Sequence, residues 1–165
     1  QRNGIAFAQG KMKVGEAMAP PLIQAVKKTE LACATTVIDA PPGTSCPVIA
    51  AVKGTDFVLM VTEPTPFGLH DLKLAVEAVK TLGIPCGIII NRADLGTDGT
   101  EVYAGKENIP ILMKIPFERR IAEAYSRGQL IVDAFPEWKE KFSALPGAIE
   151  KIIAGWNPSP AGERD

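Results

Sequence analysis

The chain has 165 residues, 46% of them hydrophobic and 22% charged, and this composition excludes a disordered segment or a coiled coil. Its 18 basic and 19 acidic residues give a formal net charge of −1, which argues against an electrostatic nucleic-acid surface. No apolar run approaches the roughly 20 residues of a membrane span and no signal peptide is visible, so we expect a cytoplasmic protein without a membrane span.

The N-terminal third carries short structural signals. Alternating apolar residues on either side of a glycine favour a hairpin over residues 5–14. A proline pair suits the first turn of a helix over residues 20–31. A β-branched run at residues 36–38 then predicts a strand that ends at Asp39.

The rest of the chain alternates strand-sized apolar runs with amphipathic segments. The clearest amphipathic helix lies between two glycines, where apolar residues recur at helical spacing. The last helix contains Pro146, which is expected to kink or split it. The expected strands cover residues 57–61, 87–90 and 111–115, and the expected helices cover residues 68–83, 118–127 and 137–153.

Neither the cysteines nor the pairs of adjacent basic residues indicate a functional site. The cysteines, Cys33, Cys46 and Cys86, match no CxxC motif, and an odd number makes a poor disulfide framework. We expect all three to be small buried hydrophobic residues in a reducing compartment. Lys27-Lys28 and Arg119-Arg120 are expected to be solvated charge.

The alternation of strand-sized apolar runs with amphipathic segments predicts an α/β fold with a mostly parallel sheet covered by helices on both faces. Ligands of such sheets bind outside the carboxyl ends of the strands. Each expected strand is followed there by polar residues or proline: Asp39, Glu63, Asn91 and Pro116. The sequence therefore predicts a site at one edge of one sheet.

Asp39 and the loop after it are typical of a magnesium and phosphate site. A carboxylate that closes a hydrophobic strand can hold Mg²⁺, because this hard cation prefers oxygen ligands. Pro41 and Pro42 predict a rigid loop, in which Gly43 leaves its N–H free to approach a terminal phosphate. The alternative is that Asp39 caps a short helix opened by Pro41.

Four segments at consecutive strand ends carry a resemblance to a known family. They cover residues 37–48, 61–71, 90–94 and 115–128. In order and spacing they resemble the MinD/ParA/Mrp group of deviant-Walker P-loop ATPases, in particular the MinD-superfamily ATPases with an inserted ferredoxin domain, often labelled cobyrinic acid a,c-diamide synthase-like. This resemblance spans roughly residues 11 to 135, and four motifs in register are far more specific than one. It implies a P-loop NTPase fold of the SIMIBI type.

The chain lacks two sequence features of that family, the phosphate-binding loop and the cysteines of the ferredoxin insert. The family binds phosphate with a Gly-rich loop, but the Gly-Lys pairs here, at residues 10–11 and 105–106, are followed by Met12 and Glu107 instead of Ser or Thr. The cysteines of the ferredoxin insert are absent as well. We therefore expect residues 1–155 to be the C-terminal portion of one P-loop ATPase domain, with a frayed tail at residues 156–165. No catalytic residue is expected in this chain alone.

The strand that carries the phosphate-binding loop in the family would be absent from this chain, and its absence has a structural consequence. In the family it lies between the strands that here would end at Asp39 and Val61, and its loss exposes two sheet edges. We expect the chain to close this gap, to borrow a strand from a second copy, or to pair with its missing half.

The resemblance also assigns roles to residues at the strand ends. It implies that Asp39 binds Mg²⁺ through water and that Gly43 senses the γ-phosphate of ATP. It implies that Asn91 contacts the adenine base, which Pro116 and Glu118 flank. It further implies a homodimer through the nucleotide face and a redox or iron–sulfur partner, with any iron–sulfur cluster confined to the missing ferredoxin insert.

Other interpretations remain open. Asn91 can simply cap the turn before Gly96. The run from Asn91 to Asp94 also resembles the NKxD motif, which would make the protein a guanine-nucleotide switch. A third hypothesis, from a different class, is a non-catalytic interaction module. The favoured one is an ATP-dependent switch of the MinD type that is inactive as this chain alone.

Overall fold

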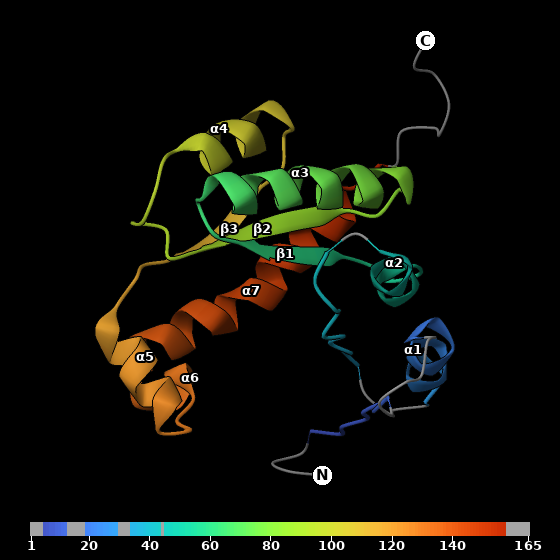
Figure 1. The fold of residues 1–165 in the computed structure, drawn as a ribbon, viewed down its shortest axis with the longest axis horizontal. Helices are drawn as coiled ribbons and strands as arrows, with labels where there is room; N and C mark the ends of the chain where they lie inside the picture. The colour runs from blue at the N-terminus through green and yellow to red at the C-terminus, as the bar shows by residue number, and fades with distance from the viewer. Residues whose placement is uncertain (1–4, 13–18, 30–33, 44, 158–165) are drawn as a thin grey trace. The chain divides into compact units, whose positions relative to one another are not determined.

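The computed structural model describes residues 5–12, 19–29, 34–43 and 45–157. They belong to two compact units, an N-terminal unit of residues 1–55 and a C-terminal unit of residues 56–165 (Figure 1). The N-terminal unit contains helices α1 (Ala19–Lys27) and α2 (Cys46–Val52). The C-terminal unit contains β1 (Val58–Thr62), α3 (Pro66–Thr81), β2 (Cys86–Asn91), α4 (Gly99–Lys106), β3 (Ile111–Ile115), α5 (Arg119–Ser126), α6 (Ile131–Ala134) and α7 (Pro136–Gly155).

The C-terminal unit is built on a parallel sheet of three strands in the order β1-β2-β3. Helices α3 and α4 cover one face of this sheet and α7 covers the other (Figure 1). Both faces of β2 are therefore covered, and five of its six residues are buried. These observations confirm the predicted α/β class and the parallel sheet with two covered faces, an arrangement compatible with a P-loop NTPase-like fold.

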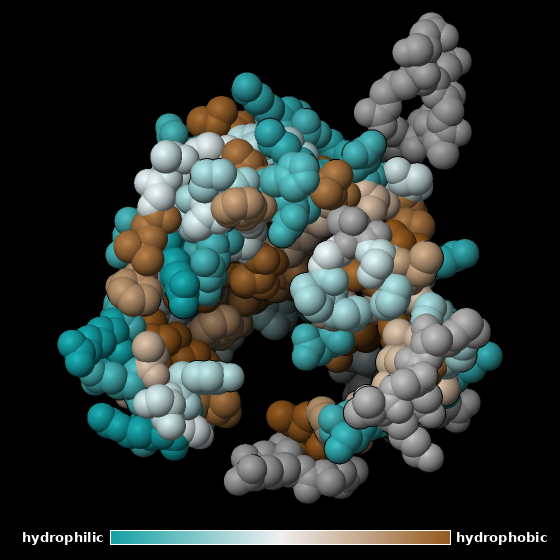
Figure 2. Space-filling model, viewed as in Figure 1, coloured by the Kyte–Doolittle hydropathy of each residue, from teal (hydrophilic) through white to brown (hydrophobic). Residues whose placement is uncertain are grey.

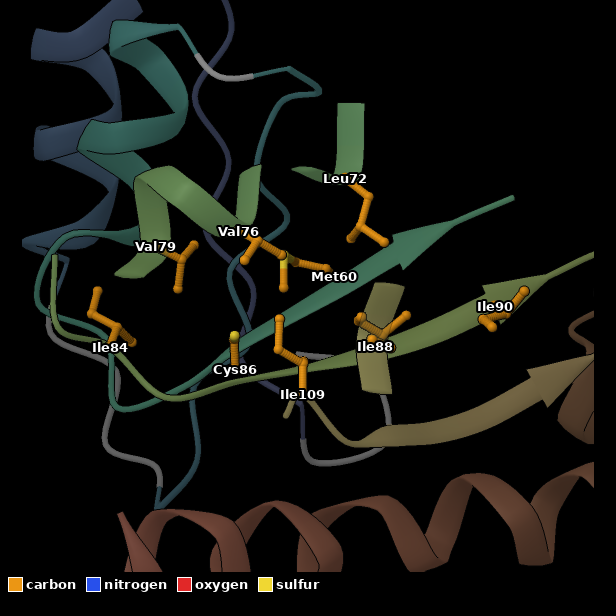
Figure 3. Close-up of a cluster of buried hydrophobic side chains, with 10 residues drawn as sticks. Met60, Leu72, Val76, Val79, Ile84, Cys86, Ile88, Ile90 and Ile109 are labelled. Carbon is orange, nitrogen blue, oxygen red and sulfur yellow. The ribbon is translucent and has the colours of Figure 1, made fainter. Parts of the chain in front are cut away.

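Helix α3 forms where the sequence predicted the clearest amphipathic helix. Its first turn is fixed by Thr65, whose hydroxyl accepts a hydrogen bond from the Gly68 amide at 3.0 Å. Leu72, Val76 and Val79 recur at helical spacing and are all buried. They pack on a cluster contributed mainly by β1, β2 and the segments that flank them: Met60, Ile84, Cys86, Ile88, Ile90, Ala104 and Ile109 (Figure 3).

The opposite face of the sheet packs on α7. Trp138 of this helix is 1% exposed and forms a cluster with Ile89 and Met113 of the two neighbouring strands. The ring of Phe142 extends this cluster, with its centroid 6.2 Å from that of Trp138. Although Pro146 lies inside α7, the helix continues to Gly155, so it is not split there, and the alternative of a kink stays a prediction.

An expected strand and an expected hairpin of the N-terminal unit are not seen in the described residues. Residues 34–40 contain no strand, so the prediction that Asp39 closes one is wrong. A short β-branched run becomes a strand only where another strand offers hydrogen bonds, and none pairs with this run in the described residues. In the expected hairpin, Ile5 makes an isolated bridge, residues 6–12 are irregular, and residues 13–14 lie outside the described residues.

The expected closing of the sheet is not seen either. Strand β1 lies at the edge of the sheet, and no other described strand pairs with its outer side. Val61 of this strand is 64% exposed, and Figure 2 shows hydrophobic surface over β1. Whether the edge pairs with a second copy or with further chain stays a prediction.

Single residues of the sequence analysis also need correction. Lys27 is not simply solvated, because its ammonium caps the end of α2 by donating to the carbonyls of Ala51 at 2.8 Å and Lys53 at 2.7 Å. Cys46 is exposed rather than buried. Cys86 is buried as expected, and burial raises the pKa of its thiol. Cys33 lies outside the described residues.

Candidate functional site

Three of the four predicted strand ends meet at one edge of the sheet in the C-terminal unit. Glu63 follows β1, Asn91 is the last residue of β2, and Pro116 follows β3. The strands are parallel and Asn91 is paired with Ile115, so these residues lie side by side. Asp39 and Gly43 belong to the N-terminal unit, which is described separately below.

The carboxylate of Glu63 links the first two strand ends. The side-chain nitrogen Nδ2 of Asn91 donates to Oε1 of Glu63 at 3.5 Å. The Nε of Arg92 lies 3.5 Å from the same oxygen. The Arg92 and Glu63 side chains are 51% and 39% exposed, so solvent screens this ion pair and it contributes at most about 1 kcal/mol to stability. Its effect is to orient the polar groups.

The loop after β2 is held tightly against the ends of the other two strands. Arg92 adopts the left-handed conformation, with φ of 50°. The next amide, that of Ala93, donates to the carbonyl of Ile115 at 2.9 Å. Gly96, with φ of 131°, lies so close to the carbonyl oxygen of Pro64 that a Cβ atom would come within 1.9 Å of it. This loop therefore has little freedom to move away from the strand ends.

The end of β3 is joined to the same loop. Oδ1 of Asp94 accepts a hydrogen bond from the backbone amide of Phe117 at 2.5 Å. The guanidinium carbon of Arg92 lies 5.6 Å from the centre of the Phe117 ring, within the range of a cation–π contact. We call the connected side chains of Glu63, Asn91, Arg92, Asp94 and Phe117 the strand-end ring, since they join the ends of all three strands.

Glu118 lies next to this ring, but its carboxylate is engaged elsewhere. It accepts a hydrogen bond from Arg120, which also binds Glu137 at 2.9 Å and stacks on the ring of Phe135 at 4.6 Å. The hydrogen bond to Glu118 is the main cause that raises the pKa of the Arg120 guanidinium. Arg120 is thus exposed, as expected of a solvated charge, but it also forms ion pairs, and one of them engages the carboxylate of Glu118.

Asp39 lies in a pocket of the N-terminal unit. The pocket has a volume of about 440 Å³, and it is lined by α1 and by two irregular segments: Gly10, Met12, Ala19, Leu22, Ile23, Asp39, Ala40, Pro41 and Pro42. Asp39 is exposed, and among the described residues of this lining it supplies the only ionisable side chain. The helix that was expected to open at Pro41 is absent, since α2 begins only at Cys46.

Gly43 follows this pocket with φ of 92°, a conformation that favours glycine, and no described residue other than its chain neighbours has an atom within 4 Å of the position of an added Cβ. Its surroundings are therefore open enough for the close approach of a ligand.

The pocket fits a metal ion only together with other ligands. Among the described residues, no three His, Cys, Asp or Glu side chains come together as a metal site. Mg²⁺ keeps several waters and is commonly held by one or two carboxylates plus the phosphates of a substrate. A single exposed carboxylate, as at Asp39, suits a Mg²⁺ ion that arrives with a nucleotide.

Sequence reasoning located the strand ends but missed how their side chains connect. Arg92 and Phe117 were given no role in adenine binding, and Glu63 was named only as a residue that follows a strand, without its contact with Asn91. The available signal was position, because each of these residues comes within two residues of a strand's last residue.

In the described part of the chain, no helix is both long enough and apolar enough to span a membrane.

Comparisons with known proteins place the chain near two groups. No family model matches it. The uncharacterized protein MJ0579 of Methanocaldococcus jannaschii is 34% identical over 149 residues, which cover 89% of this chain and 49% of that protein. The uncharacterized protein MJ0578 of the same organism is 26% identical over 156 residues, which cover 91% of this chain and 52% of that protein.

Proteins named iron–sulfur cluster carrier protein form the second group. Those of Pyrococcus horikoshii and Pyrococcus furiosus are each 31% identical over 111 residues, which cover 58% of this chain and 38% of theirs. The chain spans about half the length of the two Methanocaldococcus relatives it matches. It is thus similar to iron–sulfur cluster carrier proteins over more than half of its own length.

Proposed function

We propose that this chain is the base-recognition and switch II portion of a Mg²⁺- and ATP-dependent switch of the MinD type, related to iron–sulfur cluster carrier proteins. The observation that carries the proposal is the side chain of Asn91, held at the carboxyl edge of a parallel sheet beside the segment that begins at Pro116. In open α/β sheets this edge is where ligands bind. The similarity to the carrier proteins supports the same conclusion.

The proposed roles divide between the two units. In the C-terminal unit, the amide of Asn91 hydrogen-bonds to the adenine base, and Pro116 with the backbone of Glu118 flanks it. In the N-terminal unit, Asp39 binds Mg²⁺ through water and Gly43 approaches the γ-phosphate. A complete protein would add the phosphate-binding loop, so hydrolysis is not expected of this chain alone. The further proposals are dimerisation through the nucleotide face and an iron–sulfur partner.

The strand-end ring favours adenine over the guanine alternative. A guanine site of the NKxD type needs the carboxylate of Asp94 to accept hydrogen bonds from the base. Here Oδ1 of Asp94 already accepts one from the Phe117 amide at 2.5 Å. A guanine base that bonds both oxygens of Asp94 would therefore have to share Oδ1 with this amide, which weakens its contact relative to one with an unengaged carboxylate.

Calorimetry with Mg²⁺ tests this proposal. We expect the full-length gene product that contains these residues to bind ATP, and Asn91→Ala to weaken the binding about tenfold, the effect of one lost hydrogen bond of roughly 1.4 kcal/mol. We expect this chain alone to bind at least a hundredfold more weakly, on the order of the several phosphate contacts it lacks. Glu107→Ala, which removes a carboxylate near the opposite edge of the sheet, is the matched control. No ATP binding by the full-length protein would contradict the proposal.

A further inference from the structure

We propose that Glu63 is a positioning residue that sets the base preference of this site, because it fixes which end of the Asn91 amide faces the ligand. This inference rests on the proposed function, since it presumes that a purine base meets Asn91. It goes further by assigning the choice between adenine and guanine to a side chain that does not touch the base.

The orientation of an asparagine amide follows from its hydrogen-bond partners. An amide carries a donor, NH₂, and an acceptor, the carbonyl oxygen, and a neighbouring carboxylate can only accept. Oε1 of Glu63 lies 3.5 Å from Nδ2 of Asn91, so the nitrogen faces the carboxylate. With one N–H of Nδ2 directed at the carboxylate, the oxygen Oδ1 of Asn91 remains as the acceptor that can meet a ligand. The reversed amide would bring two acceptors together at this distance.

Arg92 reinforces this orientation from the other side of the carboxylate. Its Nε lies 3.5 Å from the same oxygen of Glu63, and its guanidinium stacks on the ring of Phe117. A cation next to the carboxylate holds Oε1 in place as an acceptor. Arg92 cannot itself be displaced easily, because its left-handed backbone is followed by the amide of Ala93, which is bound to the carbonyl of Ile115.

The backbone that carries Glu63 is equally constrained. The carbonyl of Glu63 accepts a hydrogen bond from the Thr65 amide at 2.8 Å. A Cβ atom at Gly68 would lie 2.3 Å from that carbonyl oxygen, and one at Gly96 would lie 1.9 Å from the carbonyl of Pro64. Two glycines therefore allow two segments to approach the Glu63-Pro64 backbone closely. Glu63 extends from a fixed support, as a positioning residue requires.

The chemistry of the purine edges turns this orientation into selectivity. At the same place on the ring, adenine carries an amino group that donates and guanine carries an oxygen that accepts. With Oδ1 facing the ligand, Asn91 accepts a hydrogen bond from adenine but opposes the guanine oxygen. Removing the carboxylate lets the amide rotate and present its NH₂ group, which suits guanine as well.

The test compares ATP and GTP affinities of the full-length protein with Mg²⁺ before and after substitution of Glu63. The ratio of the two affinities isolates the base, because both nucleotides carry the same phosphates and ribose. We expect Glu63→Ala to lower the ratio of ATP affinity to GTP affinity about tenfold, which corresponds to about 1.4 kcal/mol. Glu63→Gln retains an acceptor oxygen, which the neighbouring Arg92 Nε favours at the position of Oε1, and is expected to keep most of the ratio. Glu107→Ala should leave it unchanged.

The outcomes separate this inference from the function on which it rests. An unchanged ratio in Glu63→Ala, or an equal loss of ATP and GTP affinity, would overturn the positioning role while leaving nucleotide binding intact. A wild-type protein that binds neither nucleotide would overturn the proposed function, and the inference with it. Glu63→Leu, which fills more of the space but has no acceptor, provides a second variant if Glu63→Ala does not fold, and the same fall in the ratio is expected of it.

Discussion

Gly96→Ala is expected to destabilise the C-terminal unit by about 2–5 kcal/mol, since it combines a strained backbone with a steric clash. Gly96 has φ of 131°, where residues with a side chain are strained, and its new Cβ would lie 1.9 Å from the carbonyl oxygen of Pro64. The loop from Arg92 to Gly96 would have to move, and the strand-end ring would open with it. We therefore expect nucleotide affinity of the full-length protein to fall as well.

Urea unfolding followed by tryptophan fluorescence measures this effect. Both tryptophans, Trp138 and Trp156, lie in the C-terminal unit, so the signal reports on that unit alone. Gly105→Ala is the matched control, because Gly105 lies in α4 with no atom within 4 Å of an added Cβ, and alanine is expected to stabilise the helix by about 0.5–1 kcal/mol. An unfolding midpoint for Gly96→Ala equal to that of wild type would contradict the close packing of this loop.

Ile88→Ala is expected to cost about 2–5 kcal/mol of unfolding free energy, the range for deleting a large aliphatic side chain from a packed core. Ile88 is fully buried at the centre of β2 and lies against the residues of α3 and β1 shown in Figure 3. The same fluorescence measurement applies. Val61→Ala, on the neighbouring strand but 64% exposed, should cost less than about 1 kcal/mol. Equal losses in the two variants would mean that β2 is not the central strand of the core.

The elements that the sequence predicted correctly are those whose own residues carry the signal. Strand β3 matches its predicted bounds at both ends, and α3 begins two residues before the predicted glycine. In both, burial on the sheet enforces the periodicity visible in the sequence. Helix α4 was missed because it lies in a polar, glycine-rich stretch and is anchored to the core mainly by two small buried residues, Thr100 and Ala104.

The failures concern features that depend on distant partners. Residues 36–38 have β-branched side chains, but a strand also needs a neighbour, which their own sequence cannot supply. Lys27 and Arg120 looked like solvated charges because one partner of each, the end of α2 for Lys27 and the side chain of Glu137 for Arg120, lies at least 17 residues away along the chain.

The site shows the same division. Its location followed from the strand order, whereas the strand-end ring depends on the left-handed turn at Arg92 and on the contact of Gly96 with Pro64. Neither feature leaves a periodic pattern in the sequence. The hydrogen bond between Asn91 and Glu63, separated by 28 residues, could be found only from the folded structure.

The structure of the full-length protein with Mg²⁺ and a non-hydrolysable ATP analogue tests the central claim most directly. We predict that the adenine base lies between Asn91 and the segment from Pro116 to Glu118, with its amino group within hydrogen-bond distance of Oδ1 of Asn91. The carboxylate of Glu63 should still hold Nδ2. A base bound away from these strand ends would contradict the account.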